Sequence, residues 1–183
     1  MIAAEAGPSA SAAAGFAMLG APLLITTADH ALLRPEWIAQ FLRDAPADAD
    51  VVAMLAKREA IEAVAPGTRR TYLRFADGDW SGCNLFLLAT PRASAAIALW
   101  QTVEADRKRP WRIVGRLGPA LLLRFLLRRL PLSDAIAHLG RRAGVNAAIV
   151  SAEDGRAAID VDKPSDLDLV RQIVPKTPQR PTD

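Results

Sequence analysis

Three aspartates lie at the ends of predicted strands, in positions from which carboxylates commonly act on ligands. Asp29 follows the apolar and β-branched run Leu23–Thr27, and Asp160 and Asp162 alternate within Ala157–Asp162, a predicted short strand with both carboxylates on one face. Open α/β sheets bind ligands at the carboxyl ends of their strands, and Mg²⁺ is usually held by one or two carboxylates plus substrate phosphates. The pattern therefore predicts a magnesium–nucleotide site, although strand-end aspartates also serve as helix caps.

The elements around Asp29 alternate between strand and helix. The run Leu23–Thr27 is followed by an amphipathic helix at Arg34–Arg43, with Pro35 in its first turn, and then by an apolar strand at Asp50–Ala56. A strand–helix–strand unit of this kind indicates two strands that run in the same direction, and hence a largely parallel sheet. We therefore expect an α/β fold with Asp29 at the edge of the sheet where ligands bind.

The rest of the chain supplies further elements of the same kind. The small residues between Trp80 and Asn84 are expected to form a loop before a strand at Leu85–Ala89. Other strands are predicted at 72–75 and 145–150, and helices at 91–106, 119–130, 133–140 and 163–174. We expect one domain over residues 1–174, with a helical excursion at about 107–142, and a disordered tail over 175–183.

Two further groups of residues are candidates for contact with phosphate. The turn Gly7–Ser11 leads into a helix that runs to about Leu19, and its two serines suit either simple helix capping or an anion. The basic candidates are Arg69, Arg70 and Lys108. Charged residues of this kind are also common on solvated surfaces, so spacing alone leaves both roles open.

Composition limits the classes to which the chain can belong. No apolar run within its 183 residues approaches the roughly 20 that span a membrane, and its start lacks the pattern of a signal peptide. The single cysteine, Cys83, excludes an intramolecular disulfide and is consistent with a reducing cytoplasm, where we expect the protein. Low aromatic content argues against a nucleic-acid platform, whereas the local basic segments Arg107–Arg116 and Arg124–Arg142 suit phosphorylated small molecules or anionic lipid.

The predicted helix Pro119–Leu130 combines a very apolar face with three arginines, Arg124, Arg128 and Arg129. The simplest interpretation is a helix packed on the domain with its arginines in water. The alternatives are a basic amphipathic surface that touches a membrane or a lipid-like substrate, and a contact between copies in an oligomer.

Four segments together resemble the MobA-like nucleotidyltransferases. Residues 22–33, PLLITTADHALL, are similar to that family's strand-then-aspartate motif, and residues 81–88, SGCNLFLL, to the segment that lines its acceptor pocket. Residues 157–170, AAIDVDKPSDLDLV, resemble its closing motif, and residues 7–11, GPSAS, resemble a segment that contacts the nucleotide. The resemblance implies a Rossmann-like, three-layer α/β/α fold with a mostly parallel central sheet, of the nucleotide-diphospho-sugar transferase type.

The resemblance also implies roles for individual residues. Asp29 would be the principal Mg²⁺ ligand and Asp162, with Asp160, the second. The nucleotide would meet Pro8, Ser9, Ser11 and Asp29, and the acceptor would lie against Gly82 and Asn84. Arg69, Arg70 and Lys108 have no counterpart in the family pattern and are candidates for binding phosphate on the acceptor. The implied reaction transfers a nucleoside monophosphate from an NTP to a small phosphorylated or hydroxylated acceptor and releases pyrophosphate.

One departure from the family pattern bears on activity. The family's glycine-rich phosphate loop has no counterpart upstream of Gly7, so we expect an N-terminally incomplete domain or a degenerate relative. An alternative function follows, in which a non-catalytic module binds a nucleotide or a membrane surface through the helix at 119–130.

Overall fold

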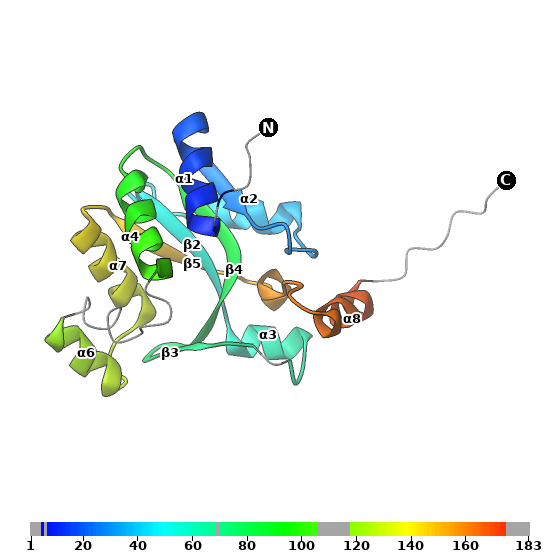
Figure 1. Cartoon of the computed structure of the whole chain (residues 1–183). Helices are drawn as coiled ribbons and strands as arrows, with labels where there is room; N and C mark the ends of the chain where they lie inside the picture. The colour runs from blue at the N-terminus through cyan, green and yellow to red at the C-terminus, as the bar shows by residue number, and fades with distance from the viewer. Residues whose placement is uncertain (1–4, 6, 69, 106–117, 175–183) are drawn as a thin grey trace.

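The computed structural model describes Glu5 and residues 7–68, 70–105 and 118–174 (Figure 1). The helices are α1 (Pro8–Leu19), α2 (Pro35–Asp44), α3 (Arg58–Val64), α4 (Ala93–Ala105), α6 (Pro119–Leu126), α7 (Leu132–Ala143), the 3₁₀ helix η1 (Gly155–Ala158) and α8 (Pro164–Ile173). The strands are β1 (Leu23–Thr26), β2 (Val51–Lys57), β3 (Leu73–Phe75), β4 (Gly78–Leu88) and β5 (Ala147–Ser151). The expected helical excursion lies partly, and the expected tail wholly, outside these residues.

The sheet is mixed, which corrects the expectation of a mostly parallel one. Its order is β1-β4-β2-β5, with β3 paired to β4. β4 is antiparallel to β1, β2 and β3, and only β2 and β5 form a parallel pair. β1 and β2 do run in the same direction, as the strand–helix–strand pattern predicts, but β4 lies between them. Sequence periodicity reports the direction of successive strands and carries no information about a later strand inserted between them.

Three local expectations are wrong. The segment Trp80–Asn84, expected as a loop, belongs to the eleven-residue strand β4. The segment Ala157–Asp162, expected as a strand, is instead the end of η1 followed by irregular chain. Helix α3 was not predicted at all. The α/β class, the helix at residues 8–19 and the helix after Pro35 are confirmed.

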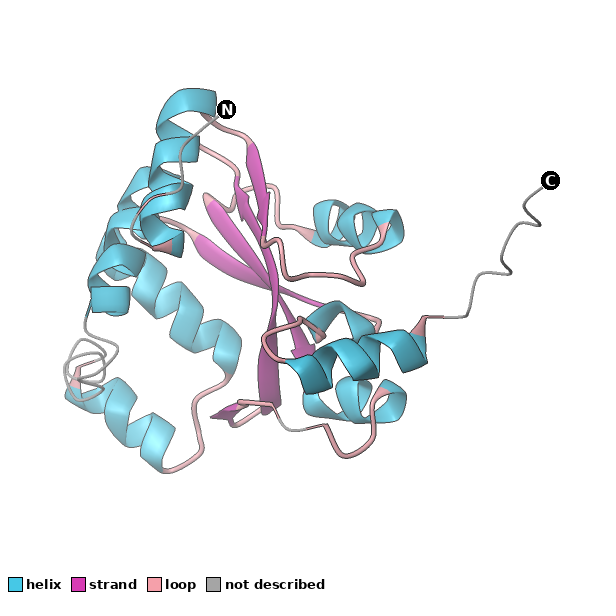
Figure 2. Cartoon of the chain, turned by 45° about the vertical axis from the view of Figure 1, so that its right-hand side comes forward, coloured by secondary structure: helices cyan, strands magenta, loops and turns pink. Residues whose placement is uncertain are grey.

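Helices cover both faces of the sheet, so the core has two parts (Figure 2). On one face the largest apolar cluster joins α2, α3, η1 and α8 to the sheet, with Phe41, Ile61 and Ile159 fully buried. On the other face α1 and α4 pack near β1 through a cluster that includes Ile97. Helix α7 packs near the opposite end of that face through Leu132 and Trp80. The alternation of side chains along each strand supplies both clusters.

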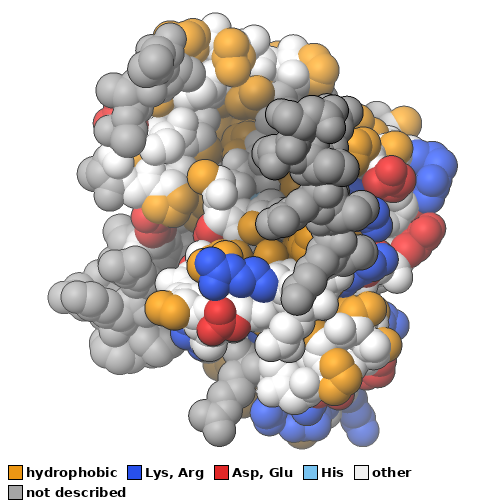
Figure 3. Space-filling view, turned by 90° about the vertical axis from the view of Figure 1, so that its right-hand side faces the viewer, with side chains coloured by type: hydrophobic (Ala, Val, Ile, Leu, Met, Phe, Trp, Pro, Cys, Tyr) orange, Lys and Arg blue, Asp and Glu red, His pale blue; other side chains and the backbone are white. Residues whose placement is uncertain are grey.

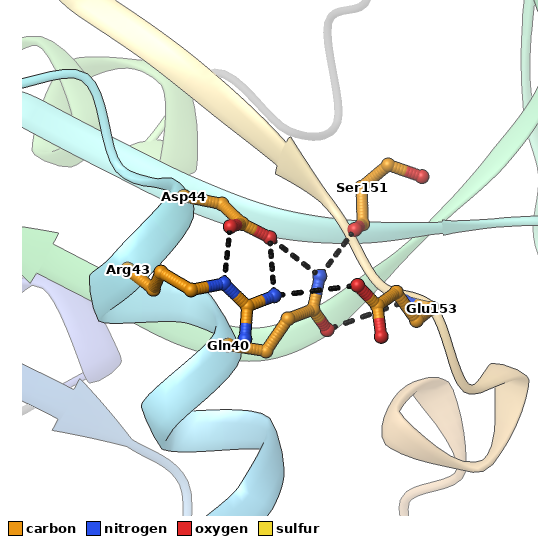
Figure 4. A network of polar contacts seen from close by, with 5 residues as sticks. All are labelled: Gln40, Arg43, Asp44, Ser151 and Glu153. Atoms are coloured by element: carbon orange, nitrogen blue, oxygen red, sulfur yellow. Dashed lines mark hydrogen bonds and ion pairs between the residues drawn. The ribbon is translucent and has the colours of Figure 1, made fainter.

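A polar network joins α2 to the end of β5 (Figure 4). The amide nitrogen of Gln40, a residue only 5 % exposed, donates to the carbonyl of Ser151 at 2.9 Å, and its amide oxygen accepts from the backbone N–H of Glu153. Arg43, at the surface, pairs with Asp44 and Glu153. The buried amide therefore fixes the helix against the strand, and the exposed ion pairs add little.

Asp50 stabilises the start of β2. Its buried carboxylate accepts from the hydroxyl of Thr90 at 2.6 Å and from the backbone N–H of Asn146 at 2.8 Å. The hydrogen bond from Thr90 is the main cause that lowers the pKa of Asp50 below its ordinary value of 3.8. Asp50 thereby connects the segments that precede β2, follow β4 and precede β5.

We expect the substitution Asp50→Asn to lower stability at neutral pH and to have a smaller effect in acid. Because the folded pKa is depressed, the ionised form stabilises the fold above pH 3.8, and this contribution is lost as the pH falls below that value. Urea unfolding of both proteins at several pH values should show their midpoints converging in acid. A constant difference between the midpoints would contradict this assignment.

Cys83 lies on β4 within the larger cluster and is 1 % exposed. Burial raises the pKa of its thiol to about 12. We expect iodoacetamide to leave native Cys83 unmodified at about pH 8 and to alkylate it after unfolding, because the thiolate is the reactive form. Mass spectrometry of the native and denatured protein measures both states, and rapid native labelling would show that this part of the core opens.

No helix in the described part of the chain is long and apolar enough to cross a membrane.

Candidate active site

The turn after β1 holds Asp29 in a fixed position. Its carbonyl accepts from the N–H of Ala31 at 2.9 Å, and the hydroxyl of Thr27 donates to one oxygen of its carboxylate. His30, 7 % exposed, stacks on Trp37 with ring centroids 6.0 Å apart. The turn is thus anchored in the core by His30 while the half-buried Asp29 faces a cleft.

Burial keeps His30 neutral in this turn. Desolvation lowers its pKa, and the charges of Asp160 and Asp29 oppose that shift without reversing it. A neutral imidazole adds no charge beside the carboxylates and packs as an aromatic ring against Trp37.

The segment that carries Asp160 and Asp162 is tied at both ends. Ile159 is fully buried, and the N–H of Val161 donates to the carbonyl of Asp29 at 3.0 Å. Beyond it, the N–H groups of Asp162 and Lys163 both donate to the carboxylate of Asp166, at 3.2 and 3.1 Å. Asp166 is therefore occupied as the third helical residue in the capping box of α8, and the Val161–Asp29 hydrogen bond brings the two acidic segments together.

Glycine at position 155 allows η1 to approach α3. A Cβ added there would collide with the backbone of Ala60. This close packing sets the position of η1, and hence where the acidic segment after it begins.

Both carboxylate oxygens of Asp160 accept hydrogen bonds from protein groups. One oxygen accepts from the Arg70 guanidinium at 2.7 Å, and the other accepts from the Asn84 amide at 3.0 Å. The side chains of Arg70 and Asp160 are 13 % and 21 % exposed, so solvent screens this ion pair only partly. Three residues predicted from the sequence thus form one network, which spans the segment before β3, β4 and the segment after η1.

A β-bulge directs Asn84 toward Asp160. The register of β2 against β4 shifts between Ala53 and Leu55, which pair with Phe86 and Gly82. Asn84 lies within that bulge with φ of 51°, in the left-handed region that asparagine tolerates better than most residues. The bulge re-aims a side chain that a regular strand would orient differently.

Two adjoining pockets meet at Asn84, Asp160 and Asp162. The larger, of about 940 Å³, runs along β1 and α1 and includes Asp29, Phe86 and Trp100; we call it the large cleft. The smaller, of about 350 Å³, is lined by Gly82 and by polar and charged residues that include Thr68, Arg70, Thr71 and Lys163; we call it the polar pocket. A ligand in one would therefore lie beside a ligand in the other.

Figure 3 shows the side of the molecule on which α8 lies. The surface is hollowed in its middle, hydrophobic side chains are visible within the hollow, and basic and acidic side chains lie around it. The face thus combines apolar surface with charged groups, as a site for a charged organic ligand requires.

The carboxylates fit a metal that arrives with phosphate better than one held by protein alone. No group of three or more histidine, cysteine or acidic side chains within the described residues is arranged to bind a metal. Asp29 keeps one carboxylate oxygen, and Asp162 both, without a hydrogen bond or ion pair among those found in this structure. Two carboxylates are sufficient for Mg²⁺ when substrate phosphates and waters complete its octahedron.

The residues expected to meet a nucleotide lie in two environments. Pro8 and Ser11 line the large cleft. Ser9 is 4 % exposed, and its N–H donates to the Glu104 carboxylate of α4 at 3.2 Å. A carboxylate of the protein thus occupies part of the N-terminus of α1, where the sequence left an anion site open. Arg69 and Lys108 lie outside the described residues.

Sequence reasoning missed Glu104, Thr27 and Lys163. Glu104 and Thr27 act through contacts that no motif encodes, since one reaches α1 from a distant helix and the other bonds within a turn. Lys163 could have been found from the sequence, because the proline after it marks the start of a helix. A residue just before such a start lies at the mouth of a site built on strand ends.

We expect Arg70→Met to destabilise the protein by about 2 kcal/mol, because it leaves the half-buried Asp160 without its cation. The matched control is Arg43→Met, whose side chain is 61 % exposed and whose loss should leave the unfolding midpoint unchanged. Denaturant unfolding of the two variants measures the difference. Equal midpoints for both would mean that the Arg70–Asp160 pair does not stabilise the fold.

The fold is shared with a solved structure described as a hypothetical transferase from Thermus thermophilus. The two chains superimpose with a TM-score of 0.80 and are 32 % identical, over 90 % of this chain and 71 % of that chain. No family model and no curated protein matches this chain.

Proposed function

Because the chain belongs to the family of the hypothetical transferase from Thermus thermophilus, we propose that it is a transferase, and specifically a magnesium-dependent nucleotidyltransferase. An NTP would bind in the large cleft and a small acceptor in the polar pocket. The observation that carries this proposal is the shared wall of the two pockets, where Asp160, Asp162 and Asn84 border both and Asp29 borders the cleft.

Two features of the large cleft support nucleotide binding. Phe86 and Trp100, whose ring centroids lie 5.6 Å apart, provide aromatic surface for a base. Among the described residues β1 pairs only with β4, so its outer edge supplies backbone N–H and C=O groups to the cleft. The phosphates would then extend toward Asp29 and Asp162.

Asp29 and Asp162 would hold Mg²⁺ together with the phosphates of the nucleotide. When bound, the metal would offset negative charge that develops on the phosphate oxygens. The protein itself would hold donor and acceptor in line, so that an acceptor oxygen attacks the α-phosphorus. The bond between the α-phosphorus and the oxygen that bridges to the β-phosphate breaks, and pyrophosphate leaves with the bonding electrons, while a hydroxyl acceptor would release its proton to water.

The polar pocket favours an acceptor that carries a phosphate or a hydroxyl. Lys163 is exposed and lines the pocket, where its ammonium group lies 3.9 Å from Asp166. Arg70 is engaged by Asp160, so Lys163 is the more accessible cation of the two. The hydroxyls of Thr68 and Thr71 add hydrogen-bonding groups.

Calorimetric titration with the four NTPs, with Mg²⁺ and with EDTA, tests the nucleotide site. We expect Mg²⁺-dependent binding that Asp29→Asn and Asp162→Asn each weaken about tenfold or more, because each removes a charged metal ligand. The control is Asp168→Asn on α8, whose side chain is 65 % exposed and pairs with Arg171. This variant should bind as the wild type does.

Pyrophosphate release in the presence of phosphorylated and hydroxylated acceptors tests the transfer itself. Release that depends on Asp29 supports the assigned reaction. NTP binding that is independent of Mg²⁺ and unchanged in Asp29→Asn and Asp162→Asn would refute the metal assignment.

A further inference from the structure

Helix α6 is apolar on two opposite sides. Toward the protein, Leu121, Leu122 and Phe125 are half-buried, and the Phe125 ring packs edge-on against Phe75 of β3 with centroids 5.5 Å apart. The side facing away carries three leucines that are 57 %, 67 % and 55 % exposed, namely Leu123, Leu126 and Leu127. Their i, i+3, i+4 spacing places them together, and we call them the leucine face.

The leucine face is unusual for a helix at a protein surface. A surface helix normally presents polar residues to water, and a helix apolar all round belongs in a core or in lipid. Single exposed leucines are common, but three adjoining ones on one helix mark an interaction surface. Since Phe125 and the buried Leu130 already fix the helix to the domain, the leucine face is not required for its attachment.

Positive charge is concentrated in the part of the sequence that contains this helix. Residues 106–143 contain ten of the chain's 23 basic residues and two of its 20 acidic residues, so the segment carries +8 and the rest of the chain −5. Within the described part, Arg128 and Arg129 follow the leucine face directly and are exposed, and Arg124 is half-exposed beside Asp134. The arrangement combines exposed leucines with a basic rim.

Arg128 occupies a position where glycine is the usual choice. Its φ is 52°, in the left-handed region just after the end of α6, where a non-glycine residue is strained. Its side chain forms no hydrogen bond or ion pair among the described residues. No hydrogen bond or ion pair among the described residues offsets this strain, which favours a role for the charge of Arg128 outside the fold.

We propose that α6 docks the protein on an anionic lipid surface, with the leucine face entering the headgroup boundary and Arg128 and Arg129 contacting lipid phosphates. An eight-residue helix is about 12 Å long, so the contact is peripheral and lies along the surface. The large cleft is lined by α1 and β1, and Figure 1 shows α6 next to β3, far from α1. Docking therefore leaves the cleft accessible and is independent of the proposed reaction.

The charge and the apolar surface together favour an anionic membrane over a second copy of the chain and over a nucleic acid. If two copies of the chain paired through their leucine faces, Arg128 and Arg129 of both copies would come together, which like-charge repulsion disfavours. A nucleic-acid backbone would satisfy the arginines but offers no apolar surface for the leucines. An anionic membrane satisfies both, because acyl chains accept the leucines and headgroups the arginines.

Vesicle co-sedimentation of the full chain tests the proposal, with phosphatidylcholine vesicles that contain either no phosphatidylserine or about a quarter of it. We expect the chain to bind only the vesicles that contain phosphatidylserine, and we expect added salt to weaken that binding. Leu126→Glu should reduce binding about tenfold or more, because it replaces an apolar contact of the leucine with a negative charge that the anionic headgroups repel. Met18→Glu on α1, equally exposed at 64 %, is the matched control and should bind as the wild type does.

The substitution Arg128→Gly removes the charge of this side chain without destabilising the fold. It relieves the left-handed strain, so the thermal unfolding midpoint should be unchanged or higher, while binding to anionic vesicles falls about fivefold. Absence of vesicle binding, or binding that Leu126→Glu and Arg128→Gly leave unchanged, overturns the proposal. A concentration-dependent dimer abolished by Leu126→Glu, or binding to oligonucleotides in place of vesicles, overturns it in favour of those partners.

Discussion

The insertion of β4 between β1 and β2 is the constraint on which the candidate site depends. Because β4 runs antiparallel to both, its bulge brings Asn84 to the place where the chain leaves η1. A regular strand would send alternate side chains to fixed faces, and the bulge allows one residue to depart from that rule. One strand thereby separates the large cleft from the polar pocket and supplies a side chain to both.

The carboxylates at this place have different environments. Asp160 is neutralised by Arg70 and hydrogen-bonded by Asn84, which makes it a structural support for the wall. Within the described part of the chain, Asp29 and Asp162 keep carboxylate oxygens without a hydrogen-bond partner, and both line the large cleft. Negative charge gathered on one wall is unfavourable unless cations offset it, and Arg70 does so for one of the three. The remaining two carry the charge that a ligand with a divalent cation would offset.

The domain combines this site with a basic, apolar helix on another part of its surface. α6 is attached to the fold through Phe125 and Leu130, while its other side is exposed. The two features use different elements, so one can be altered without the other. A small transferase that acts close to a membrane would have its substrate cleft and its point of attachment on separate surfaces.

Local patterns in the sequence determined the α/β class, the helices at α1, α2 and α8, the direction shared by β1 and β2, and the candidate acidic residues. These depend on contacts between neighbours in the chain, which periodicity and capping residues report. Tertiary structure alone decided that the sheet is mixed, that Ala157–Asp162 is no strand, and that Asp160 is paired with Arg70. Those outcomes depend on contacts between segments far apart in sequence. Such contacts form only where burial of both faces of the sheet makes one packing more stable than its alternatives.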